Sequence, residues 1–196
     1  TAALGAVGLC FPLIMIITAC SNLFGSGGAP LFSINRGMDD NHKANTILNT
    51  SFSMVCASSI LLMLVGLIFS KPLLILFGAS KNALIYARPY MMIYLLGTLP
   101  AMISTGMNPF INAQGYSTTG MFSVVIGAVA NIILDPLFIF ALGLGVRGAA
   151  IATVISQCLS AAFVLFFLTK KSELKLRFLH KNEIPECTGH AKNILS

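Results

Sequence analysis

The sequence predicts an all-α polytopic membrane protein with five transmembrane helices, and three observations lead to this prediction. The 196 residues are 56% hydrophobic and only 9% charged, whereas soluble domains carry roughly 25% charged residues. The mean hydropathy is +0.87, and one soluble core of this size cannot bury so much apolar surface. Apolar runs of about 20 residues, the length that crosses a bilayer as a helix, recur along the chain. The bilayer is therefore the predicted solvent.

Five apolar segments are expected to cross the membrane, joined by short connections that make neighbouring spans antiparallel. The first contains the stretch FGSGGAP and the last contains GAAIATVIS, whose small residues let helices approach each other closely. The expected spans cover residues 3–32, 46–69, 84–110, 121–143 and 146–169.

Prolines interrupt these apolar runs. They are Pro12, Pro100, Pro109 and Pro136. Each lacks an amide hydrogen and frees the carbonyl four residues earlier, so each predicts a kink. Membrane helices tolerate such breaks where other groups or a cavity satisfy the freed backbone.

The net charge of +6 is distributed at the ends of the apolar runs and in the tail, without interleaved aromatic residues. This pattern predicts a membrane orientation and no nucleic-acid partner. One side receives seven basic residues, Arg36, Lys43, Lys170, Lys171, Lys175, Arg177 and Lys181, against four on the other side, Lys71, Lys81, Arg88 and Arg147. The first side is the predicted cytoplasmic side. Thr1 then lies outside, so we expect an earlier helix and a longer protein.

The sequence contains no motif that is typical of an enzyme active site or of a metal site. The five cysteines are scattered without a CxxC pair and are expected to act as small hydrophobic residues. Cys187 and His190, with His180, fit no familiar zinc spacing. The sequence shows no Ser/His/Asp order, no Gly-rich phosphate loop and no paired carboxylates. We therefore expect neither an enzyme nor a bound cofactor.

The candidate functional residue is an aspartate inside the fourth span, in the stretch AVANIILDPLFIFALG. Asp135 is the only acid between Asn41 and Ser172, and a charge at this depth costs several kcal/mol, so such residues are functional by default. Asn131 lies one turn earlier on the same helix face, and Pro136 frees the carbonyl of Ile132. The grouping offers hard oxygen ligands suited to a proton or to Na⁺.

Two further pairs of polar residues have the spacing of one helical turn. Tyr90 and Tyr94 lie in the third span, and Thr153 and Gln157 lie in the fifth. Taken alone, each pair is expected to make interhelical hydrogen bonds or to anchor the chain at the interface. Beside Asp135, they become candidate members of its site. The alternative for Asp135 is a structural tie between helices, which would require a protonated carboxyl.

The run NIILDPLFIFALGLGVRGAAIATVISQ (131–157) resembles the fifth and sixth helices of multidrug and toxic compound extrusion (MATE) transporters. The stretches at 24–45 and 87–115 resemble the second helix with its cytoplasmic loop and the fourth helix. The resemblance covers residues 3–170 and is greatest to the bacterial drug-efflux branch of MepA-like and DinF-like transporters.

The resemblance implies twelve helices in two six-helix lobes. Residues 1–170 would supply helices two to six of the N-terminal lobe, and 171–196 a cytoplasmic linker between the lobes. It implies a multi-pass protein of the bacterial plasma membrane that exchanges H⁺ or Na⁺ for cationic amphipathic drugs. Asp135, Asn131, Tyr90 and Thr153 would form the N-lobe cation site. The first helix and the second lobe would be partners within the same protein.

Two alternatives remain open from the sequence. One is a flippase for lipid-linked oligosaccharides from the same superfamily. Such sites usually need cationic side chains for phosphate, and the span interiors have none, which favours the antiporter. The other is a membrane enzyme or a non-catalytic membrane subunit. An enzyme would need a second catalytic group near Asp135, and the sequence offers none in the membrane.

Overall fold

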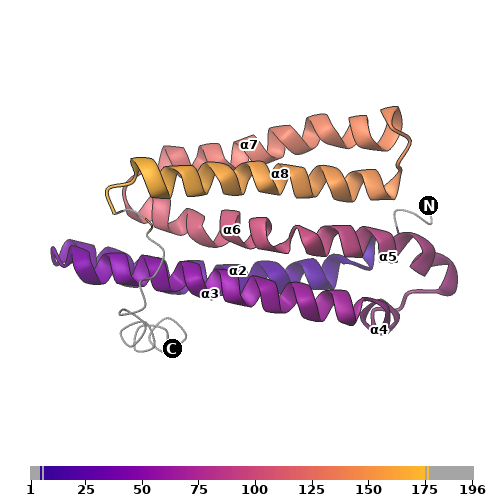
Figure 1. The fold of residues 1–196 in the computed structure, drawn as a ribbon, viewed down its shortest axis with the longest axis horizontal. Helices are drawn as coiled ribbons and strands as arrows, with labels where there is room; N and C mark the ends of the chain where they lie inside the picture. Colours follow the sequence, from indigo (N-terminus) through magenta and orange to yellow (C-terminus); the bar gives the residue numbers. More distant parts are fainter. Residues whose placement is uncertain (1–4, 6, 175, 177–196) are drawn as a thin grey trace.

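The computed structural model describes residue 5, residues 7–174 and residue 176. All the regular elements in this part of the chain are helices, in the order α2 (Phe11–Gly37), α3 (Asn41–Ile68), α4 (Ser70–Leu76), α5 (Lys81–Leu96), α6 (Thr98–Ala113), α7 (Ser117–Pro136) with the π-helical turn η1 (Leu137–Ala141), and α8 (Val146–Phe166) with the π-helical turn η2 (Phe167–Lys171). The long helices run side by side as an elongated bundle (Figure 1). The all-α fold class is confirmed.

The five expected spans are confirmed by length and hydropathy. Helices α2 and α3, α7 with η1, and α8 with η2 are each long and apolar enough to cross a membrane. The fifth span is the pair α5 and α6, which bends by 54° at its break. The α2–α3 connection, the α6–α7 connection and the end of α8 lie at one end of the bundle, and the α7–α8 loop lies at the other (Figure 1). This arrangement agrees with the sidedness predicted from the basic residues.

The proline predictions have different outcomes. Pro100 is close to the break at Gly97, and Pro136 is the last residue of α7 before η1. Pro12 lies in the first turn of α2, where its missing amide hydrogen leaves no helix bond unmade. Residues 5, 7 and 8 are helical and residues 9 and 10 form a turn, so the helical run is interrupted just before Pro12, as expected, and α2 begins at Phe11. Pro109 stays inside the continuous helix α6.

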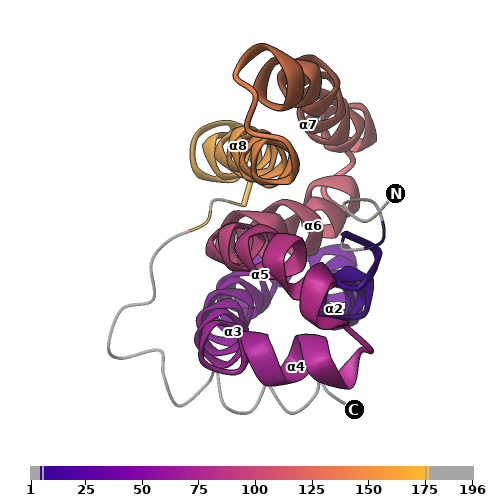
Figure 2. The same cartoon turned by 90° about the vertical axis from the view of Figure 1, so that its right-hand side faces the viewer.

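Two helical features were not expected from the sequence. The connection after α3 contains the short helix α4, which lies across the bundle instead of along it (Figures 1 and 2). The span expected at 84–110 with a kink at Pro100 is instead two separate helices, and Gly97 lies between α5 and α6. A Cβ at Gly97 would lie 2.6 Å from a methyl group of Val154, so glycine also lets α8 pack closely at the bend.

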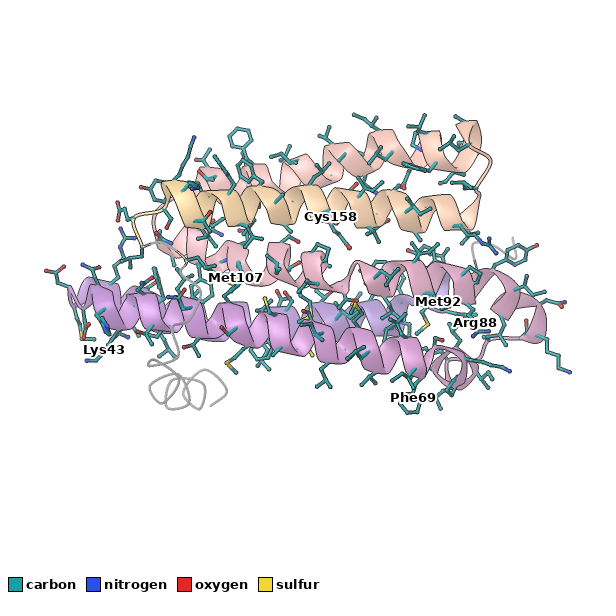
Figure 3. The ribbon with its side chains drawn as sticks, in the orientation of Figure 1. Lys43, Phe69, Arg88, Met92, Met107 and Cys158 are labelled. Atoms are coloured by element: carbon teal, nitrogen blue, oxygen red, sulfur yellow. The ribbon has the colours of Figure 1, made fainter. Side chains whose placement is uncertain are left out.

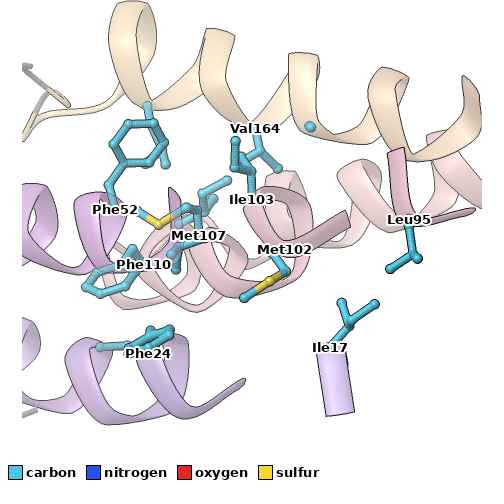
Figure 4. Packing of buried hydrophobic residues seen from close by; sticks show 14 of the residues in the cluster. Ile17, Phe24, Phe52, Leu95, Met102, Ile103, Met107, Phe110 and Val164 are labelled. Atoms are coloured by element: carbon cyan, nitrogen blue, oxygen red, sulfur yellow. The ribbon is translucent and has the colours of Figure 1, made fainter. Parts of the chain in front are cut away.

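The apolar core lies among α2, α3 and α6, with contributions from α5 and α8 (Figure 4). Phe32 of α2 meets Phe110 of α6 edge to face, with ring centroids 5.7 Å apart, a preferred aromatic geometry. Gly28 allows this approach, because a Cβ there would lie 2.6 Å from the Phe110 ring. The expected packing role of the FGSGGAP stretch is therefore confirmed for Gly28.

Helix α7 packs differently from the others. Gly120 and Ser123 are its only buried residues, and it contacts mainly α8, with fewer contacts to α6. The apolar side chains of Ile132 and Ile133 are largely exposed, as are those of many of its other residues. In the described part of the chain, α7 therefore forms an outer wall with one polar side turned toward its neighbours.

The segment after α8 binds back to the end of the bundle where α6 ends. Ser172 donates a hydrogen bond to the Gln114 side-chain oxygen, and Arg36 of α2 forms an ion pair with Glu173. Most of the linker expected at 171–196 lies outside the described residues.

Candidate cation site

The aspartate that the sequence singled out lies in the last turn of α7 and faces α8. The Asn131 side-chain amide lies 3.3 Å from Asp135 Oδ1 and 3.5 Å from Thr153 Oγ1 on α8. The Thr153 hydroxyl donates to the carbonyl of Ala149, at 2.9 Å, in its own helix. Its oxygen can therefore still accept from the amide. Asn131 thus links the carboxylate of one helix to the hydroxyl of the next.

Tyr90 approaches the same region from α5. Its side chain is buried and stacks on Tyr94, with ring centroids 6.2 Å apart. Among the described contacts, Tyr90 and Asp135 form no hydrogen bond with each other. The structure therefore links Asp135 and Thr153 through Asn131, and no described hydrogen bond joins Tyr90 to them.

Tyr94 and Gln157 connect this group to the centre of the bundle. The Gln157 amide lies 3.4 Å from the Tyr94 hydroxyl, which joins α8 to α5. The side-chain oxygen of Gln157 is buried and has no hydrogen-bond partner within the described residues. A buried acceptor of this kind is costly unless water or an ion satisfies it.

A cavity of about 410 Å³ lies between α6, α7 and α8 and reaches Asn131 and Thr153. Nine of its twelve lining residues are polar. We call these nine the polar seam: Ser104, Thr105, Asn108, Ser123, Asn131, Thr153, Ser156, Gln157 and Ser160. A smaller cavity of about 90 Å³ shares Ser104, Thr105 and Gln157 and extends toward α2. Polar groups and space of this size are what bound water requires.

Hydrogen bonds within the polar seam hold α6, α7 and α8 together. Asn108 of α6 donates to the Gly120 carbonyl at 2.9 Å and to the Ser123 hydroxyl at 2.6 Å, both on α7. Ser160 of α8 donates to the Ser123 carbonyl at 2.7 Å. The sequence analysis did not identify Asn108, Ser123 or Ser160. Serines one turn apart on α8, at 156 and 160, were the signal that could have indicated this face.

No basic side chain among the described residues pairs with Asp135. The ion pairs in that part of the chain are Arg36 with Glu173 and Lys43 with Asp40, at the other end of the bundle (Figure 1). The carboxylate therefore has an amide and no cation as its protein partner. The described residues contain no cluster of three metal-binding side chains of the His, Cys, Asp or Glu type, and the zinc spacing considered at 180–190 lies outside them.

A bundle of long apolar helices, one pair of them bent by 54°, around a cavity lined by polar residues defines the class of protein: a polytopic α-helical membrane protein. The MatE family model matches residues 1–137, and the chain belongs to this family.

Curated relatives agree with this assignment. The chain is 29% identical over 170 residues to the multidrug export protein MepA of Staphylococcus haemolyticus and 29% identical over 171 residues to that of Staphylococcus aureus. Each match covers 87% of this chain and 38% of the relative. The chain thus spans well under half the length of the curated relatives it matches.

Solved structures agree as well. An outward-facing multidrug resistance MATE family transporter of the MOP superfamily superposes with a TM-score of 0.91 at 28% identity, over 100% of this chain and 43% of that one. An inward-facing form of such a transporter gives a TM-score of 0.89, also at 28% identity, over 99% and 44%. The chain therefore has the fold of slightly less than half of a MATE transporter.

Proposed function

We propose that the protein to which this chain belongs is a cation-coupled antiporter that exports cationic amphipathic drugs, with H⁺ or Na⁺ as the coupling ion. In this proposal Asp135, Asn131, Thr153 and Tyr90 form the cation site of the N-terminal lobe. The remaining helices of the protein, the lipid bilayer and the drugs are its partners. The MepA relatives are named multidrug export proteins, and their bacterial origin supports a multi-pass protein of the plasma membrane.

One observation carries the proposal: a membrane carboxylate bonded to an amide and unpaired with any described cation stands beside a polar cavity. A carboxylate in these surroundings can exchange its amide partner for a proton or for Na⁺. The Thr153 hydroxyl and the Tyr90 hydroxyl would supply further oxygen ligands. An ion that binds here more tightly in one conformation than in another shifts the balance between the two, and only such differential binding can couple its gradient to transport.

The flippase alternative is less favoured by the cavity. Its lining contains no lysine or arginine, and a phosphate-bearing oligosaccharide lipid would need cationic partners. One structural neighbour, a MOP superfamily transporter from Pyrococcus furiosus, has a title that attributes a different function to a binding pocket of reversed polarity. At 26% identity it does not change the assignment proposed for this chain.

The test is efflux of a cationic dye from cells that produce the full-length protein. Proton and sodium gradients are collapsed separately with selective ionophores, and cells carrying the empty vector are the control. We expect efflux above the control that stops when one of the two gradients is removed. Efflux that survives collapse of both gradients and stops on ATP depletion would contradict the proposal.

A further inference from the structure

The short helix α4 has the position of an interfacial helix. It follows the membrane-spanning α3 directly and lies across the bundle (Figure 2). Leu74 is fully buried against the bundle, while Ile75 and Leu76 of α4 expose 52% and 78% of their surface, and Ile68 and Phe69 just before α4 are exposed as well. Exposed apolar side chains on a helix in the plane of the membrane are stable when they enter the boundary between headgroups and acyl chains. Helix α4 therefore marks the membrane surface at this end of the bundle.

A groove of about 310 Å³ lies between α4 and α5. Lys71 of α4 lines it together with Leu84, Ile85, Arg88 and Pro89 of α5. The four α5 residues share one helix face, because they follow the spacing of one turn. Figure 3 shows Arg88 on α5 near α4. The groove thus combines two cations with an apolar wall.

Neither cation of this groove forms an ion pair within the described residues, where the pairs involve Arg36 and Lys43. Lys71 and Arg88 are both exposed. Three of the four described acids, Asp39, Asp40 and Glu173, belong to the opposite end of the bundle (Figure 1). The groove therefore carries positive charge that no described side chain neutralises.

We propose that the α4–α5 groove binds the headgroup phosphate of an anionic membrane phospholipid between Lys71 and Arg88. Arginine forms paired hydrogen bonds with phosphate oxygens, and lysine adds a compact charge. The apolar wall contributes Ile85, which is 67% exposed, as a surface for the acyl chains. A free phosphate would gain the two charges but would leave this wall and the exposed side of α4 without a partner. The membrane position of α4 thus selects a lipid.

This site is separate from the polar seam and does not depend on the transport proposal. The test uses the purified full-length protein in detergent, titrated with phosphatidylglycerol and, in parallel, with phosphatidylcholine of the same acyl chains, with binding followed by native mass spectrometry. We expect phosphatidylglycerol to bind more tightly. Lys71→Gln and Arg88→Gln should each weaken it about fivefold, the effect of one basic side chain near an anionic membrane surface, and Arg88→Lys should weaken it less than Arg88→Gln, because it keeps the charge but loses the paired hydrogen bonds.

The matched control is Lys81→Gln, which removes one positive charge from the same end of the chain but outside the groove. It should leave the affinity for phosphatidylglycerol unchanged. Equal losses in Lys81→Gln and Lys71→Gln would replace the proposed site by diffuse charge attraction. Equal binding of the two lipids would overturn the proposal, and displacement of phosphatidylglycerol by millimolar inorganic phosphate would identify the groove as a free-anion site.

Discussion

The two sides of this bundle are held together by different chemistry. Helices α2, α3 and α6 meet through large apolar side chains such as Phe32, Phe110 and Met107, which are fully buried. Helix α7 and its π-helical turn contribute no residue to that cluster. They meet α6 and α8 through serine, asparagine and glycine instead. Tight apolar packing leaves no room for water, whereas the polar seam lines an open cavity of about 410 Å³.

The acids of the two sides differ in the same way. Asp40 precedes α3 at the end of the bundle, accepts a hydrogen bond from the Lys43 amide and pairs with its ammonium group at 2.8 Å. Asp135 lies within a membrane span and has the Asn131 amide, at 3.3 Å, as its partner. A carboxylate at a helix start with a cation beside it stabilises the fold. A carboxylate with an amide beside a cavity is instead placed to exchange partners.

The largest effect is expected when the exchangeable carboxylate is removed. Asp135→Asn keeps the size of the side chain and can still meet Asn131, but it can neither release a proton nor neutralise a sodium ion. The coupling ion then loses its differential affinity, and coupled transport should fall by at least about tenfold while membrane abundance stays near wild type. The measurement is dye efflux per unit of inserted full-length protein.

The variant Asn131→Ala should have a smaller effect on efflux than Asp135→Asn. It removes the amide between Asp135 and Thr153 but leaves the carboxylate, so the loss of one hydrogen bond, about 0.5–1.5 kcal/mol, should reduce efflux only severalfold. Unchanged efflux in Asp135→Asn would assign the carboxylate a structural role and remove the contrast between the two sides.

A substitution on the apolar side should lower the stability of the protein and leave the efflux per folded molecule nearly unchanged. A Cβ at Gly28 would lie too close to the Ser51 hydroxyl and 2.6 Å from the ring of Phe110, and both side chains are fully buried. Gly28→Val should therefore destabilise the protein by about 1–3 kcal/mol through overpacking. We expect less protein in the membrane and a lower melting temperature in detergent, with near-normal efflux per molecule that folds.

The control for this packing variant is Gly37→Ala at the end of the same helix. A Cβ at Gly37 would meet no atom within 4 Å, so this substitution should leave abundance close to wild type. Similar losses at both positions would indicate a general cost of replacing glycine in α2 and would weaken the role assigned to the contact with Phe110.

The sequence predicted the spans well because their length and hydropathy are local properties. It also located the bend near Pro100 and the change to a π-helical turn after Pro136, whereas the kink expected at Pro109 is absent from the continuous helix α6. It failed at α4, where seven residues are too few to give a periodic signal. It did not identify Gly97 as the residue between α5 and α6, because the reason for glycine there is a neighbour on α8.

The candidate site, too, was predicted where its signal lies within one helix and missed where the signal comes from several helices. Asp135 and Asn131 were paired by the spacing of one turn within a single helix. The polar seam was not predicted, because Asn108, Ser123 and Ser160 come from three different helices. Each of them resembles an ordinary polar residue within its own segment. Only the folded chain shows that they face one cavity.

The smallest effect is expected at the structural acid, Asp40. The hydrogen bond from the Lys43 side chain, followed by that from its backbone amide, holds the pKa of Asp40 below its ordinary value of 3.8. A carboxyl group whose pKa is lower in the folded state stabilises that state above pH 3.8 and loses this contribution as the pH falls through the folded value. The first turn of α3 should therefore open more readily below about pH 4.

The variant Asp40→Asn distinguishes the effect of the Asp40 titration from the effect of its helix-capping hydrogen bond. Asparagine caps a helix about as well as aspartate but has no charge to lose. The measurement is hydrogen exchange of residues 41–47 between about pH 5 and pH 3, corrected for intrinsic rates, in wild type and variant. We expect protection to fall with pH in the wild type and to change little in Asp40→Asn, whose protection at pH 5 should already be slightly lower. The same pH dependence in both would show that the pair with Lys43 does not stabilise α3, and Asp40 would then differ from Asp135 in position alone.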